Sequence, residues 1–434
     1  MSVLGDLRVV AVHRDFRKLF SVRLVSQCGD GMFQAGLATL FFFSPERMAT
    51  AADVAAAFAV LLLPFTVVGP FAGPLLDRWR RRQVLLIGNA VRVVLGLTLA
   101  VLMATAGVGP AVYVLALVTL GVNRFLLAAL SAALPRVVPR EQLLMANTIT
   151  PTLGAVAAVV GAGAGFLLGR LVPEGPLRDG AVLAGAALLF GAASALALRL
   201  GRDQLGPEQR SLHLWQDLRA TAGDLADGAR YLIARRTPAL GLGVMAVHRF
   251  LYGVNFIALI LISRNLLVDP SDADAGLAMF GLLVSFSFAG NGLAILLTPL
   301  AHERMTPSTW IVVCLGIGVA SQALLATSPA FWVVATAAVL LGLSVQGAKI
   351  AVDTIVQRDT HDDYRGRAFA LYDVLYNAAF VGAAALAATA LPDTGWSAVV
   401  FVALAVTYLL TAMGYRVGSM RAEARLGVGA PAGA

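Results

Sequence analysis

Gly73-Pro-Leu-Leu-Asp77-Arg78-Trp-Arg80-Arg81-Arg82 closes one long apolar stretch, residues 53–76, and leads into a second, residues 83–106. A helix needs roughly 20 mainly apolar residues to cross a bilayer, because backbone groups in hydrocarbon must bond within their own helix. Each flanking stretch is long enough to cross. The polar segment between them therefore reads as a short turn that joins two transmembrane helices on one side of a membrane.

The composition of the whole chain agrees with a lipid solvent. The 434 residues are 59% hydrophobic and only 13% charged, with a mean hydropathy of +0.80. A water-soluble core could not bury so many apolar residues, so we expect the bilayer as a partner. The net charge of +8 forms no basic stripe with interleaved aromatics, so no nucleic acid is expected. Cys28 and Cys314 lie in apolar segments far apart, and we expect neither a metal site nor a cofactor.

Twelve apolar stretches of sufficient length predict an all-α membrane protein with twelve transmembrane helices. They lie near 19–43, 53–76, 83–106, 110–134, 145–171, 180–200, 238–262, 275–300, 308–328, 330–355, 366–391 and 395–415. One long polar interruption, residues 201–237, divides them evenly. We therefore expect two six-helix bundles, residues 1–200 and 238–434, joined by a linker that contains an amphipathic helix. That helix would lie either along the membrane surface or on the loops of a bundle.

The distribution of Lys and Arg predicts the orientation of the chain. With the N-terminus inside, most basic residues fall in the inner segments, and the outer loops hold Arg47, Arg170, Arg178 and Arg264. Cytoplasmic loops carry such an excess of basic residues. We expect a multi-pass inner (plasma) membrane protein with both termini in the cytoplasm.

The segment that begins at Gly73 resembles the major facilitator superfamily motif between the second and third helices. That motif runs Gly, any, Leu, any, Asp, Arg, any, Gly, Arg, Arg or Lys, and Arg80 stands where the family has its second glycine. The resemblance implies the major facilitator fold. It also implies a gate in which Gly73, Asp77, Arg78 and Arg81 steady the outward-facing state. The alternative for the arginines is simple topology signalling.

Three further stretches resemble one branch of that superfamily. They are Phe16-Arg17-Lys18-Leu19-Phe20, Ser26-Gln-Cys-Gly29-Asp30-Gly31 and Tyr364-Arg365-Gly366-Arg367. All three are similar to segments of macrolide-efflux proteins and the enterobactin exporter, with lysophospholipid transporters as neighbours. The resemblance implies a multidrug-type efflux protein. It leaves a lipid or lysophospholipid translocator as the alternative.

Charged residues within predicted spans are candidates for the transport pathway, because a charge in the bilayer core needs a cavity or a partner. These candidates are Asp30, Arg124, His248, Arg249, Lys349 and Asp373. In the resembled fold, spans one, four, seven and ten line the central cavity. Four of the charged residues fall on these spans: Asp30, Arg124, Arg249 and Lys349. The net charge of these residues is positive, so an anionic, zwitterionic or amphiphilic small molecule is the expected substrate.

Individual roles stay open at this stage. Asp30 could exchange a proton during transport, or it could be a permanently ionised partner of Arg124 or Arg249. His248 is expected to hydrogen-bond to a neighbouring helix. Arg92, on a peripheral span, is interpreted as structural.

Lys349 and Asp373 are expected at similar depth and could form an ion pair between spans ten and eleven.

The sequence therefore predicts a monomeric secondary active transporter that works by alternating access, exports its substrate and is an antiporter with the proton as coupling ion. An enzyme is not expected, since the chain has no His-Glu-x-x-His site, no Gly-x-Ser-x-Gly elbow and no phosphate-binding loop. A membrane sensor that kept the fold without transporting is the alternative from a different class.

Overall fold

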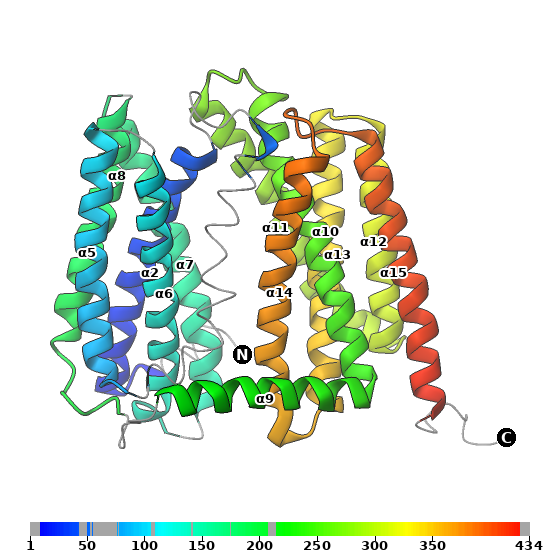
Figure 1. Ribbon diagram of the computed structural model, residues 1–434, viewed down its shortest axis with the longest axis horizontal. Helices are drawn as coiled ribbons and strands as arrows, with labels where there is room; N and C mark the ends of the chain where they lie inside the picture. Colours follow the sequence, from blue (N-terminus) through cyan, green and yellow to red (C-terminus); the bar gives the residue numbers. More distant parts are fainter. Residues whose placement is uncertain are drawn as a thin grey trace. The chain divides into compact units, whose positions relative to one another are not determined.

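The structure is a computed structural model that describes residues 9–42, 50–52, 54, 76, 78–105, 109–139, 142–173, 175–206 and 214–425. The regular structure within these ranges is helical, with twelve α-helices, a short 3-10 helix and no strand (Figure 1). The chain divides into two compact units. Unit 1 comprises residues 1–41 and 63–221, and unit 2 comprises residues 42–62 and 222–434.

The described part of unit 1 contains five long helices. They are α2 (Arg14–Phe42), α5 (Arg81–Thr105), α6 (Pro110–Ala133), α7 (Leu143–Leu171) and α8 (Pro176–Ala197), and η2 (Leu134–Arg136) extends α6. Prolines at the start of α6 and α8 suit the first helical turn, whose amides have no intrahelical partner. α5 packs along α8, and a buried cluster that includes Phe16, Leu85 and Leu126 joins α2, α5 and α6.

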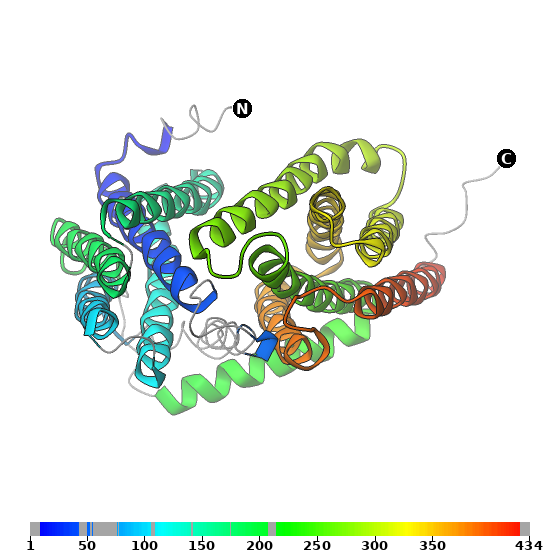
Figure 2. The ribbon, with the colours of Figure 1, turned by 90° about the horizontal axis from the view of Figure 1, so that it is seen from above.

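Unit 2 contains the other long helices. They are most of α9 (Leu214–Arg235), α10 (Thr237–Asn265), α11 (Ala273–His302), α12 (Pro307–Thr327), α13 (Phe331–Asp359), α14 (Asp362–Ala390) and α15 (Ala398–Arg425). Asp272 and Thr306 cap the starts of α11 and α12, where each side chain accepts a backbone N–H. α10 contacts α11, α13, α14 and α15, so it is the central helix of this unit (Figure 2).

Ten of the described helices are long and apolar enough to cross a membrane. α2 covers the first predicted span but is not among the ten, and it carries six charged residues between Arg14 and Asp30. The predicted span 53–76 lies outside the described residues, apart from isolated positions. Large apolar side chains such as Val159, Leu188 and Val399 are exposed on the helix surfaces. Outward-facing apolar side chains are expected where the surrounding medium is lipid.

The second half of α9 packs on unit 2. The rings of Tyr231 and Tyr364 stack with centroids 4.0 Å apart, and Arg367 forms an ion pair with Asp224 at 2.6 Å. Gly228 lets α9 approach closely, because a Cβ there would lie 2.9 Å from the Cβ of Arg367. The second half of α9 therefore contacts the start of α14, whereas its place along a membrane surface stays a prediction.

Candidate functional site

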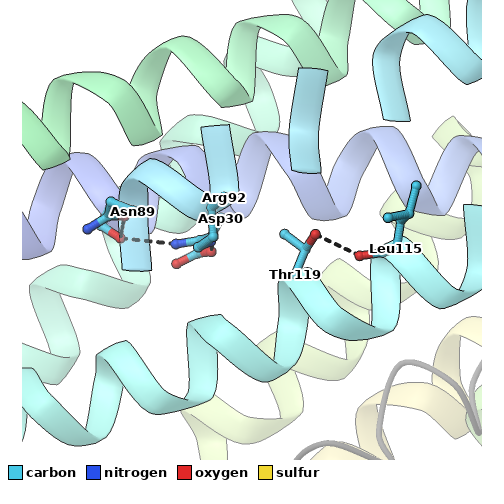
Figure 3. Close-up of polar contacts among 6 residues, drawn as sticks. Asp30, Asn89, Arg92, Leu115 and Thr119 are labelled. Carbon is cyan, nitrogen blue, oxygen red and sulfur yellow. Dashed lines mark hydrogen bonds and ion pairs between the residues drawn. The ribbon is translucent and has the colours of Figure 1, made fainter. Parts of the chain in front are cut away.

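Asp30 and Arg92 form an ion pair inside unit 1, with Asp30 on α2 and Arg92 on α5 (Figure 3). Both are buried, with 3% and 0% of their surfaces exposed. The ring of Phe190 on α8 covers the guanidinium, with its centroid 3.5 Å from Cζ. The pair thus neutralises both charges at a position shielded from solvent, which is how a membrane-embedded charge is tolerated.

A chain of hydrogen bonds continues from this pair. Arg92 Nη1 donates to Ser26 Oγ at 3.3 Å, Ser26 Oγ donates to Asn89 Oδ1 at 3.2 Å, and Asn89 Nδ2 donates to the Leu85 carbonyl at 2.8 Å. Thr119 of α6 lies nearby in Figure 3, but its hydroxyl donates to the Leu115 carbonyl of the same helix at 2.7 Å. The polar network therefore joins α2 to α5.

Within unit 1, the partner of Asp30 is Arg92, and not Arg124 as expected. The physical reason is the close approach of α2 to α8, where a Cβ on Gly29 would lie 2.7 Å from the Phe190 ring. That packing turns the next residue, Asp30, towards α5. Helical spacing could have indicated this network, because Ser26 and Asp30 lie one turn apart on α2, as do Asn89 and Arg92 on α5.

His248 lies at the centre of unit 2 and is fully buried. Its Nε2 is 3.1 Å from Ser344 Oγ, its Nδ1 is 3.0 Å from the Tyr408 hydroxyl, and Ser344 Oγ donates to the Cys314 carbonyl at 2.6 Å. Since Ser344 uses its proton on that carbonyl, it accepts from Nε2–H, and Nδ1 accepts from Tyr408. The arrangement suits a neutral imidazole that connects α10 to α13 and α15, in line with the expected hydrogen-bonded neighbour.

Arg249 is adjacent in sequence but faces different surroundings. Its guanidinium carbon lies 4.1 Å from the centroid of Tyr376, 4.4 Å from that of Phe380 and 5.2 Å from that of Tyr252. We call these three rings and Arg249 the aromatic cage. No carboxylate within the described part of unit 2 forms an ion pair with Arg249, so cation–π contacts are its main attraction there. Residue spacing could have indicated the cage, because Tyr376 and Phe380 share one face of α14.

A pocket borders the aromatic cage. It offers about 40 Å³ of open space between α10, α11, α13 and α15, and Tyr252 contributes to its wall. The rest of its lining is mainly apolar, with Asn255 and Ser287 as polar groups. The space is large enough for small groups or water.

Lys349 has a different partner from the expected one. Its ammonium lies 2.6 Å from Asp353, one turn further along α13, and 5.9 Å from the centroid of the Tyr372 ring on α14. A carboxylate one turn away on the same helix is within easy reach, so it takes the place expected for Asp373. Asp373 itself is exposed on α14, and Arg124 is half-buried on α6 of unit 1.

The basic residues that begin α5 bind backbone carbonyls elsewhere in unit 1, including those at the ends of α6 and α8. Arg81 Nη1 donates to the carbonyls of Ala132 and Leu205 at 2.9 and 3.1 Å, and Arg82 Nε donates to that of Ala197 at 3.4 Å. Cations at helix C-termini satisfy free carbonyls and favour the helix dipole.

The residue that departs from the family motif, Arg80, forms an ion pair with Asp203 at 2.6 Å. Arg78 is half-buried in the turn before α5, whereas Gly73 and Asp77 lie outside the described residues.

Comparison with known proteins gives relatives along nearly the whole chain, although no family model matches it. MFS-type transporters of Mycobacterium tuberculosis and Mycobacterium bovis are each 36% identical over 387 residues, 88% of this chain and 86% of the relative. The crystal structure of nucleoside transporter NupG aligns with a TM-score of 0.63 at 15% identity, over 93% of this chain and 99% of that one. The inward-facing bacterial homologue of the iron transporter ferroportin aligns with a TM-score of 0.64 at 13% identity, over 94% and 98%. At these identities the two structures indicate the fold alone.

Proposed function

The chain belongs to the MFS-type transporters of the major facilitator superfamily, and we propose that it exports an anionic or zwitterionic amphiphile by alternating access. It is a multi-pass membrane protein and a secondary transporter. A drug or a siderophore is the substrate type suggested by the resemblance to macrolide-efflux proteins and the enterobactin exporter. In this proposal the protein is a monomer in the inner membrane, has both termini in the cytoplasm, and needs no cofactor and catalyses no reaction.

The aromatic cage carries the proposal for the substrate. Arg249 offers a positive charge within a set of rings, without an ion-pair partner among the described residues of its unit. A carboxylate or phosphate could pair with the guanidinium while an apolar body packs on Tyr252, Tyr376 and Phe380. A simple cation would be repelled by the same group.

The proposal for coupling is an inward proton that drives the substrate outward. Asp30 is a buried carboxylate that forms an ion pair with Arg92, so a change in that contact would alter its affinity for a proton. Linkage requires that the affinity differ between the inward-facing and outward-facing states.

A ligand-induced thermal-shift screen of the purified protein, with antibiotics, siderophores and lysophospholipids, would identify a ligand for flux assays in liposomes. We expect Arg249→Gln to weaken binding of an anionic ligand about tenfold or more, because a hydrogen-bonded charge pair is lost. Arg170→Gln is the matched control. Arg170 lies at the end of α7, and its guanidinium carbon is also close to an aromatic ring, 5.7 Å from the centroid of Phe166.

Two results would contradict the proposal. Equal affinity of Arg249→Gln and wild type for every ligand found would remove the aromatic cage from substrate binding. Ligand binding without any flux in liposomes would favour the membrane sensor.

A further inference from the structure

A groove at the α9 end of unit 2 is separate from the aromatic cage. It lies between the start of α10 and the end of α15 and has about 590 Å³ of open space. Leu240, Val244 and Val247 form part of an apolar wall, and Arg236 and Arg421 lie among the lining residues. The groove therefore combines an apolar wall with two positive charges.

The depth of the groove fits one leaflet of a bilayer. α10 and α15 are both long and apolar enough to cross a membrane. Val247 follows Arg236 by eleven positions, about 16 Å along a helix, which is close to half of the hydrocarbon thickness. The arginines thus lie at the level of the headgroups while the apolar wall runs alongside the acyl chains.

Both guanidinium groups are free to bind a ligand. Arg236 and Arg421 are exposed, and neither has an ion-pair partner in the ranges that the structure describes. Arg236 also has a φ of 61°, an unfavourable backbone conformation for a non-glycine residue. Its amide donates to the Leu232 carbonyl at 3.1 Å and its carbonyl accepts from Leu240 at 2.8 Å, which holds it in place between α9 and α10.

We propose that this groove binds an anionic phospholipid from the leaflet beside α9. Its phosphate would be held by Arg236 and Arg421, and an acyl chain would lie along Leu240, Val244 and Val247. Charge complementarity selects this occupant. A transmembrane helix of a partner would have to bury both arginines, whereas a phospholipid already present in the leaflet places its phosphate at their level. The inference is independent of the exported substrate.

Native mass spectrometry of the purified protein in detergent tests the site, with phosphatidylglycerol and phosphatidylcholine of equal chain length as probes. We expect wild type to retain phosphatidylglycerol preferentially. The double variant Arg236→Gln/Arg421→Gln should lose about tenfold in apparent affinity for phosphatidylglycerol, because two charge-assisted contacts are removed. Its control is Arg202→Gln/Arg219→Gln, which removes the same charge from exposed arginines outside the groove.

A second variant tests the apolar part. A Cβ on Gly243 would meet nothing within 4 Å, so Gly243→Leu should fill the groove without a clash and reduce lipid retention. Gly316→Leu is its control, at an exposed glycine of α12 with equal free space. Unchanged phosphatidylglycerol retention in both groove variants would overturn the proposal. Competition by inorganic phosphate as strong as that by the lipid would also overturn it, since it would show a plain anion site.

Discussion

The Asp30 and Arg92 charges depend on one another for their burial. Asp30→Asn should leave the Arg92 cation buried without a counter-charge and cost about 3–5 kcal/mol of stability. The double variant Asp30→Leu/Arg92→Met should regain most of that loss, because apolar side chains of similar total volume replace the pair. Thermal unfolding of the purified protein measures both. A single variant as stable as wild type would contradict a tightly coupled pair.

The His248 hydrogen bonds predict a second effect on stability. Tyr408→Phe removes the donor to Nδ1 and leaves a buried nitrogen unsatisfied, which should cost about 1–3 kcal/mol. Tyr372→Phe is the matched control, because the buried hydroxyl of Tyr372 has no hydrogen-bond partner among the described residues. We expect that variant to be neutral or slightly stabilising. Equal destabilisation by the two substitutions would contradict a specific role for the Tyr408 hydroxyl.

At the residue scale, sequence reasoning identified buried charges better than their partners. Asp30 and His248 were recognisable because a polar group within an apolar run needs a contact. The identity of that contact depends on which faces of two helices meet. The ring of Phe190 against Gly29 decides this for Asp30, and Tyr408, from α15, could not be placed beside His248 from spacing along one helix.

α2 and α7 meet through glycines, which gives a prediction at the scale of elements. A Cβ on Gly161 would lie 1.8 Å from the Cys28 carbonyl oxygen, so Gly161→Ala should force the two helices apart at a cost of about 1–3 kcal/mol or more. Gly163→Ala, on the same helix, would meet nothing within 4 Å. It should be stabilising by about 0.5–1 kcal/mol, because alanine is a better helix former. A lower unfolding temperature in both variants would contradict a specific role of Gly161 in the contact between α2 and α7.

Sequence reasoning placed the elements well and their ends less well. A hydrophobic run predicts only the part of a helix that crosses lipid. The observed helices are longer: α2 begins at Arg14 and α8 at Pro176, before the predicted starts at 19 and 180. Charged turns outside the bilayer continue a helix without any apolar signal. The contact partner of α9, the start of α14, could not be named from sequence, because an apolar stripe fits a membrane surface and a bundle equally.

At the scale of the molecule, the basic residues predict orientation. In a variant without Cys28 and Cys314, a cysteine at Ser211 should react with an impermeant thiol reagent only after the cells are opened. A cysteine at Ser271, in the turn between α10 and α11, should react in intact cells. Labelling of Ser211→Cys from outside would overturn the proposed cytoplasmic location of the linker and both termini.

Proton coupling is the other prediction at this scale, and the Asp30 pair allows a sharp test. A carboxylate couples protons to transport only if it can titrate and if its proton affinity differs between the two facing states. Asp30→Leu/Arg92→Met cannot titrate but should keep the bundle intact. If Asp30 is the carrier, this variant should lose accumulation driven by a pH gradient in liposomes while downhill exchange of the substrate persists. Asp30→Glu should retain part of the coupling, since it keeps a carboxylate. Uphill accumulation with an unchanged response to pH in the double variant would make Asp30 a structural residue, and Asp373 on α14 would become the next candidate.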